Sequence, residues 1–442
     1  MRILKNDSIH KRILRYSAFA TATLLASSAV NLTDAYFVSK LGQSATAAVG
    51  VAFAAQFLIQ AIGFTLGMGG GSLFSRALGG NDREKCDRIS AQAILQALLI
   101  GSVIAIAGNI FLDPLLDLLG ATAGIYDPSR IYLRFLLYAA PFICLSLVIS
   151  QLLRAAGNAA LSTVGFVSGG AVNLILTPLF LFIFDMGIAG AGLALLIGYV
   201  FATCLLFGLT FCKSSKVSPI KKLVNPFGAD AFRLLWTGLP SFCRHGFSGF
   251  ATLLLNNTVS AYGDHAIAAV TVVSRISLLA LSFCTGIGQG MIPVAGYHYG
   301  ARDMDSVRKS YRFALILSSA FMLILSIPIF LLAPQLVSLF REEPEIVSIG
   351  AAALRAQSTV YVLHGTITAT TMLLQVVGRS ASSTVLASAR QGIFFFPILL
   401  LFPTYFRYAQ PIADALTFLL TVYFIMIMRR LTPSKKERRH PK

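Results

Sequence analysis

The stretch Gly42–Val49 (GQSATAAV) returns 221 residues later as Gly263–Val270 (GDHAIAAV), and 221 is half of the 442-residue chain. The same interval separates other matching residues: Gly67, Gly69, Gly79, Asp82, Arg134, Gly157, Ser162 and Thr163 recur as Gly288, Gly290, Gly300, Asp303, Arg355, Gly378, Ser383 and Thr384. The constant spacing leaves room for few insertions between the two copies. A long internal repeat in an apolar chain is typical of transporters with two related halves.

The composition of the chain indicates a membrane protein. Hydrophobic residues make up 56% of it and charged residues 12%, whereas a soluble domain carries about 25% charged residues. Apolar runs of about 20 residues, long enough to cross a bilayer as helices, alternate with short polar breaks. We therefore expect an all-α membrane protein with twelve spans, near residues 13–37, 47–75, 91–113, 130–153, 161–183, 189–212, 232–258, 266–297, 311–333, 349–374, 383–405 and 409–428.

The repeat divides these spans into two bundles of six. An even number of spans returns the chain to the side on which it began, so both copies share one orientation. They are expected to be related by an axis along the membrane normal. The predicted organisation is an N-lobe over residues 1–212, a cytoplasmic linker over 213–231, and a C-lobe over 232–442 that ends in a basic cytoplasmic tail. Two such lobes are expected to face each other across a central cleft.

The formal net charge of +18 is distributed unevenly among the loops. With the N-terminus inside, the inside segments carry 27 Lys and Arg residues, and the outside loops carry four, namely Lys40, Arg130, Arg341 and Arg407. This asymmetry follows the positive-inside rule and predicts that both termini are cytoplasmic. We interpret the basic tail from Arg429 as a topology anchor attracted to anionic lipid, and we expect no nucleic-acid partner.

Ionisable side chains inside apolar spans are costly and usually functional. Asp34 lies about six residues, or ~9 Å, inside the outer boundary of the first span at Lys40. A carboxylate at that depth is suited to a proton or Na⁺ that binds and leaves, although an acid near the outer interface can also simply contact water. Asp414, near the outer start of the last span, is expected to face headgroups or water.

Several segments resemble those of multidrug and toxic compound extrusion (MATE) transporters of the MOP flippase superfamily. They are Asp34–Gly42 (DAYFVSKLG), Gly67–Gly80, Arg154–Asn158 (RAAGN) and Asn173–Pro178 (NLILTP), with Tyr262–Val270, Arg275 and Gly288–Arg302 in the second half. The likeness covers nearly the whole chain, and the order and spacing of the motifs make it specific. It implies a secondary antiporter that exports small, amphipathic drugs, toxins or metabolites by alternating access, coupled to H⁺ or Na⁺.

The resemblance assigns ion coupling to Asp34 and Asn173, which match the family's first-helix acid and fifth-helix asparagine. Many members carry a second acid four residues further, on the same helix face, where this chain has Thr177. A Na⁺ site at Asp34 and Asn173 therefore lacks one anionic ligand, and Na⁺ prefers several hard oxygens, by analogy with Ca²⁺ and Mg²⁺. We expect H⁺ as the coupling ion at Asp34, Asn173 and Thr177, and no cofactor or resident metal.

The second half departs from the family pattern, because its spans lack the acids that one branch carries in helices seven, eight or ten. The repeat partners of Asp34 and Asn173 are Leu255 and Phe394, so an acid switch is expected in the N-lobe alone. Basic groups instead suggest a wall that admits neutral, zwitterionic or anionic substrates, unless the arginines snorkel to the interfaces. The candidate substrate-cavity residues are Arg244, His245, Asn256, His364 and Gln375.

Two other functions are less consistent with the sequence. A lipid-linked oligosaccharide flippase of the same superfamily is the alternative, because arginines suit pyrophosphate groups. An enzyme is not expected, because we find no Ser/His/Asp set and no metal-ligand spacing among the six cysteines, which are Cys86, Cys144, Cys204, Cys212, Cys243 and Cys284. We expect a monomer in the plasma membrane (the inner membrane of a bacterium) whose partners are a small-molecule substrate and membrane lipid.

Overall fold

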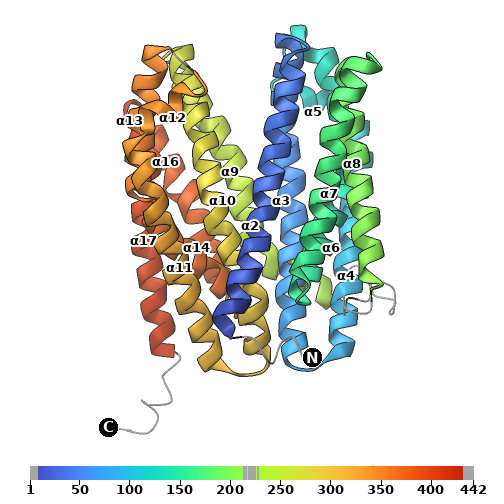
Figure 1. Cartoon of the computed structure of the whole chain (residues 1–442), viewed down its shortest axis with the longest axis vertical. Helices are drawn as coiled ribbons and strands as arrows, with labels where there is room; N and C mark the ends of the chain where they lie inside the picture. Colours follow the sequence, from blue (N-terminus) through green and yellow to red (C-terminus); the bar gives the residue numbers. More distant parts are fainter. Residues whose placement is uncertain (1–7, 213–216, 218–224, 226–227, 342, 432–442) are drawn as a thin grey trace.

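Figure 1 shows the computed structural model, which describes residues 8–212, 217, 225, 228–341 and 343–431. The described residues form twelve long helical units in two groups of six. The N-lobe contains α2 (Ile9–Ser39), α3 (Gln43–Gly79), α4 (Arg83–Ile110), α6 (Tyr126–Ala155), α7 (Ala159–Pro178) with the π-helical η2 (Leu179–Ile183), and α8 (Gly187–Thr210). The short α5 (Leu112–Leu118) and η1 (Ala123–Ile125) connect α4 to α6.

The C-lobe repeats this order with two interrupted spans. It contains α9 (Ala229–Ser260), α10 (Asp264–Gly300), α11 (Met304–Leu331), α13 (Pro344–Thr359) with α14 (Tyr361–Val376), α15 (Ser380–Ser388) with η3 (Ala389–Ile393) and α16 (Phe395–Leu401), and α17 (Phe406–Leu431). The short α12 (Ala333–Ser338) and η4 (Pro403–Tyr405) lie in its connections. The α13–α14 pair is bent by 52°.

The prediction of an all-α membrane protein with two six-helix bundles is confirmed. Among the described residues, ten helices are long and apolar enough to cross a membrane, and the bent pair α13–α14 makes an eleventh span. The remaining unit, α9, is 32 residues long and carries Asp230, Arg233 and Arg244. It begins three residues before the expected boundary at 232. Most of the predicted linker 213–231, and the tail from residue 432, lie outside the described residues.

The sequence repeat is also a repeat of backbone geometry. Gly42 and Gly263 both precede long helices with left-handed φ angles of +112° and +90°. Asp82 and Asp303 both cap the next helix by accepting a hydrogen bond from a backbone N–H three residues on. The interval of 221 also relates whole helices, because α4 spans residues 83–110 and α11 spans 304–331, and α7 and α15 begin at residues 159 and 380.

The two lobes meet through reciprocal backbone contacts between α3 and α10. A Cβ added at Gly79 would lie 1.9 Å from the Tyr297 carbonyl oxygen, and one added at its repeat partner Gly300 would lie 1.9 Å from the Arg76 carbonyl oxygen. Only glycine lets these helices approach so closely. These contacts lie at the end of the molecule that carries both termini, and the lobes diverge toward the opposite end (Figure 1).

A valine at Gly79 or Gly300 is expected to force the lobes apart at this end. Overpacking costs about 1–3 kcal/mol, so each variant should unfold at a lower temperature and transport more slowly. Gly50→Val is the matched control, because Gly50 lies on the same helix as Gly79 and an added Cβ there meets nothing within 4 Å. Thermal unfolding in detergent checks the prediction, and equal stability of all three variants would contradict the close contact between α3 and α10.

Candidate functional site

Asp34 on α2 faces two polar side chains of α7. Thr177 Oγ1 lies 3.0 Å from Asp34 Oδ1, to which it can donate a hydrogen bond. Asn173 has one amide orientation in which both of its polar atoms have partners. Its nitrogen then donates to Asp34 Oδ1 and Oδ2 at 3.1 and 3.0 Å, and its oxygen accepts from the Leu195 N–H of α8 at 3.2 Å. The structure therefore brings together all three predicted ion-coupling residues.

The site forms because α7 packs closely on α8. Asn173 and Thr177 are four residues apart and share the same face of α7, and both are buried. Gly198 of α8 permits the approach, because a Cβ added there would lie 2.9 Å from the Asn173 Cβ. Among the described residues, no basic side chain forms an ion pair with Asp34. The carboxylate is therefore held by neutral donors, and its charge is not cancelled by the protein.

The Thr177 hydroxyl suits both protonation states of Asp34. Its oxygen lies within hydrogen-bond distance of Asp34 Oδ1, at 3.0 Å, and also of the backbone carbonyl oxygen of Asn173, at 2.9 Å. A hydroxyl has one hydrogen to donate and lone pairs that accept. With a charged carboxylate, Thr177 donates to Asp34; with a protonated carboxyl, it can accept from Asp34 and donate to the Asn173 carbonyl. A second acid in this place would not offer the same exchange.

Asp34 lines a cavity inside the N-lobe of about 820 Å³, which includes the space open to its surroundings. Its wall is largely apolar, with Val30, Phe166, Leu174 and Leu195 among the lining residues. Polar lining groups other than Asp34 and Asn173 include Ser27, Asn31, Gln56 and Tyr199. The cavity thus combines apolar surface with a few polar groups, as small-molecule sites commonly do.

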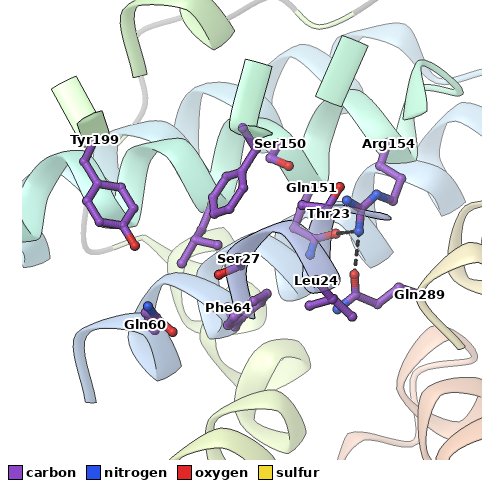
Figure 2. A pocket seen from close by; sticks show the side chains of 12 residues that line it. Thr23, Leu24, Ser27, Gln60, Phe64, Ser150, Gln151, Arg154, Tyr199 and Gln289 are labelled. Carbon is purple, nitrogen blue, oxygen red and sulfur yellow. Dashed lines mark hydrogen bonds between the residues drawn. The ribbon is translucent and has the colours of Figure 1, made fainter. Parts of the chain in front are cut away.

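A second cavity, of about 420 Å³, adjoins the first and shares Ser27, Phe166 and Tyr199 with it (Figure 2). Arg154 of α6 is 2% exposed and donates to Gln151 on its own helix and to Gln289 of α10 in the C-lobe. Figure 2 shows both hydrogen bonds at one end of the cavity. Arg154 therefore joins the two lobes beside a cavity.

None of the five candidate substrate-cavity residues lines either of these two cavities, although Phe64, on which His245 stacks, lines the second. Arg244 contacts Ser241 Oγ at 3.3 Å and Met68 Sδ at 3.7 Å, and the His245 ring stacks on Phe64 at 4.3 Å. Gln375 is fully buried and bonds to the Thr237 carbonyl and to Ser241. His364 is buried in α14, and Asn256 is half-buried in α9. Their substrate role stays a prediction.

The expectation that Asp414 faces headgroups or water is wrong. Its side chain is 1% exposed and forms an ion pair with Arg390, whose Nε lies 2.8 Å from Asp414 Oδ1. Gln410 donates to the same oxygen at 2.9 Å. Asp414 lies near the outer start of its span, which suggested a position at the membrane interface. Packing against the neighbouring helices instead buries its carboxylate. The signal that could have found the pair is the presence of opposite charges in two consecutive spans.

Comparison with known proteins gives one consistent result. The MatE family model matches residues 20–179 and 247–401, most of the chain. The chain is 27% identical over 444 residues to the multidrug export protein MepA of Staphylococcus aureus (strain MSSA476), covering 98% of this chain and 97% of that protein. It is 26% identical to MepA of Staphylococcus haemolyticus (strain JCSC1435), with 98% and 96% covered.

Solved structures agree with this match. A multidrug resistance MATE family transporter of the MOP superfamily, in an outward-facing conformation, superposes with a TM-score of 0.90 at 25% identity, covering 97% of this chain and 98% of that one. A MOP superfamily transporter from Pyrococcus furiosus shares the fold with a TM-score of 0.89 at 24% identity, with 97% and 98% covered.

Proposed function

Because this chain belongs to the MatE family, we propose that it exports small amphipathic compounds across the plasma membrane in exchange for protons bound at Asp34. Members of the family are transporters and not enzymes, and the apolar helices make this chain an integral membrane protein. The observation that carries the proposal is the Asp34 carboxylate, which is held by neutral donors at the wall of a largely apolar cavity.

The hydrogen bonds of Asn173 support H⁺ over Na⁺ as the coupling ion. A Na⁺ ion between Asp34 and Asn173 needs the amide oxygen turned toward the carboxylate. In that orientation the amide NH₂, and not the amide oxygen, faces the Leu195 N–H, so two donors meet. A proton on Asp34 needs no such rotation, because Thr177 can accept from it.

The lobe contacts support a direction of transport. With both termini in the cytoplasm, the end at which the lobes meet is cytoplasmic and the diverging end faces outward (Figure 1). A proton that reaches Asp34 from outside then neutralises the carboxylate and weakens its hold on a cationic or polar substrate. The substrate is then released outward, and the transporter with its protonated Asp34 returns to the other conformation. A ligand that binds two states unequally shifts their populations in this way.

The flippase alternative is less well supported. Pyrophosphate lipids call for basic groups along the cavity wall. Of the two cavities described, only one contains an arginine, and that residue, Arg154, already donates to Gln151 and Gln289. Proteoliposomes with separately imposed pH and Na⁺ gradients test the proposal. Dye efflux driven by the pH gradient alone is the expected result, whereas efflux driven only by Na⁺, or lipid scrambling without dye efflux, would refute it.

Thr177 offers a finer test of proton binding. Thr177→Val keeps the side-chain shape but removes the donor to the Asp34 carboxylate, and a hydrogen bond to a charged group contributes about 1.5–3 kcal/mol. The variant should hold its proton more tightly, so the pH midpoint of efflux should rise by about one unit or more. Thr177→Ser is the control that keeps the hydroxyl. Identical pH profiles for the valine and serine variants would exclude the hydrogen bond from coupling.

A further inference from the structure

The C-lobe contains a buried ion pair that the N-lobe lacks. Arg390 lies in the π-helical η3, and Asp414 lies in α17, with 13% and 1% of their side chains exposed. Gln410 and Arg390 both donate to Oδ1 of Asp414. Its other oxygen, Oδ2, is buried and has no hydrogen-bond partner in the described structure. Oδ2 of Asp414 is thus an acceptor without a donor, and a proton can bind to it.

The repeat places this pair opposite the Asp34 cavity. The residue 221 positions before Arg390 is Gly169, which lines the cavity of Asp34, and the residue 221 before Asp414 is Leu193 of α8. The interval holds for the starts of α7 and α15, at residues 159 and 380. Arg390 therefore corresponds to a glycine that lines the Asp34 cavity, and Asp414 corresponds to a leucine of α8, so the N-lobe has no charged pair at the matching positions.

Other ionisable side chains lie on the elements that pack around the pair. In the described residues, none of those within the bundle is an acid. The α17 helix packs against η3, α13, α14, α15, α16 and α9. The ionisable side chains on these elements within the bundle are Arg390 itself, Arg355, Tyr361, His364, Arg244 and His245. Tyr361 donates to Ser277 and is 1% exposed. The other acids on these elements, Glu345 and Asp230, lie in the first turns of α13 and α9, so in the described residues Asp414 is the carboxylate that balances Arg390.

A conformational change that separated α17 from η3 would break the ion pair between Arg390 and Asp414. Parting a buried pair leaves two charges in a medium of low dielectric, which costs several kcal/mol. A π-helical turn inside a span frequently marks a functional position, and η3 supplies one at Arg390. A proton on Asp414 leaves one buried charge, that of Arg390, in place of two, so α17 and η3 can separate at lower cost. The same event would also link a second proton to the transport cycle.

We propose that Asp414 is a second proton-binding site, in the C-lobe, whose proton arrives from solution at Oδ2 and releases the carboxyl from Arg390. The inference rests on the proposed proton-driven transport. Asp34 and Asp414 then each carry one proton per cycle, one in each lobe, and no other co-reactant is needed. The repeat alone pointed to a single acid switch in the N-lobe; the buried pair gives the C-lobe an acid of its own.

Two variants separate coupling from a merely structural role. Asp414→Asn cannot take up a proton at this position. The double variant Arg390→Met/Asp414→Leu replaces the pair by apolar side chains, a change that is often neutral or stabilising for a buried ion pair. Asp305→Asn is the control, since Asp305 is an exposed acid at the start of α11. The reversal potential of substrate flux in proteoliposomes then gives the number of protons exchanged per substrate.

The expected result is a ratio lower by about one proton in Asp414→Asn and in the folded double variant, with the wild-type ratio in Asp305→Asn. A wild-type ratio in the double variant would overturn the proposal, because it would show that the pair only stabilises the lobe. Infrared titration of the carboxyl C=O band, between about pH 4 and 9, gives a readout without transport. Loss of a titrating band in Asp414→Asn supports the proposal and an unchanged spectrum overturns it, whereas an unchanged spectrum in Asp34→Asn would overturn the function proposed for Asp34.

Discussion

Replacing Asp34 with asparagine is expected to abolish proton-driven efflux while the protein still folds and reaches the membrane. Asparagine keeps the shape of the side chain and can still accept from Thr177, but it neither binds nor releases a proton. The exchange of substrate for a proton in the adjoining cavity therefore ends even if substrate still binds there, and Asp414 does not line this cavity and so cannot replace Asp34. Dye efflux from proteoliposomes with an imposed pH gradient should fall to the level of empty vesicles.

The control for this variant makes the same change at an exposed acid. Asp117 lies on the short α5 of the N-lobe and is exposed. Asp117→Asn should transport at the wild-type rate, which separates the loss of coupling from a general effect of removing one negative charge. Efflux by Asp34→Asn that still responds to the pH gradient as strongly as the wild type does would remove Asp34 from the coupling mechanism.

Arg154→Met is expected to have the second large effect, on the conformation of the lobes. The substitution keeps an unbranched side chain in the space that Arg154 occupies but leaves Gln289 of the C-lobe without its donor. An unsatisfied buried polar group costs about 1–3 kcal/mol. This amount shifts the balance between the two conformations about 5- to 150-fold toward the state in which the lobes are parted at the end where α3 meets α10.

Distance measurements between spin labels test this shift. Labels on the two lobes near the termini should report longer distances in Arg154→Met than in the wild type, and labels at the opposite end should report shorter ones. Arg154→Lys is the control, because it retains a cationic donor at the same place. Unchanged distance distributions in Arg154→Met would mean that the contact with Gln289 does not stabilise this conformation.

The repeat and the apolar spans predicted the two-lobe architecture because both depend on local pattern. The spacing of the repeat and the lengths of the apolar spans can be read from the sequence itself. The same 221-residue spacing relates the backbone φ angles at Gly42 and Gly263. The grouping of Asn173 with Thr177 was predictable for the same reason, since residues four apart share a helix face. Their meeting with Asp34 came from the family resemblance, and the structure supplies the hydrogen bonds.

Contacts between distant helices were beyond the reach of these patterns. Asp414 was expected at the interface because it lies near a helix end, but its exposure depends on how α17 packs against η3 and α14. Arg244 and Gln375 were expected at a cavity because polar side chains in apolar spans are usually functional. Both contact Ser241, and neither lines the two cavities described, so their substrate role stays a prediction. Periodicity gives the face of a helix and does not give the neighbour that covers it.

Counting the protons released when substrate binds is the most direct test of the account, which holds that Asp34 exchanges a proton for substrate. The measurement uses the purified protein in weakly buffered detergent solution, with a cationic dye as the substrate and a pH indicator as the readout. If Asp34 exchanges its proton for substrate, the wild type releases protons when dye binds, and Asp34→Asn releases about one proton fewer at equal dye occupancy. Equal proton release by the two proteins, with dye bound to both, would contradict it.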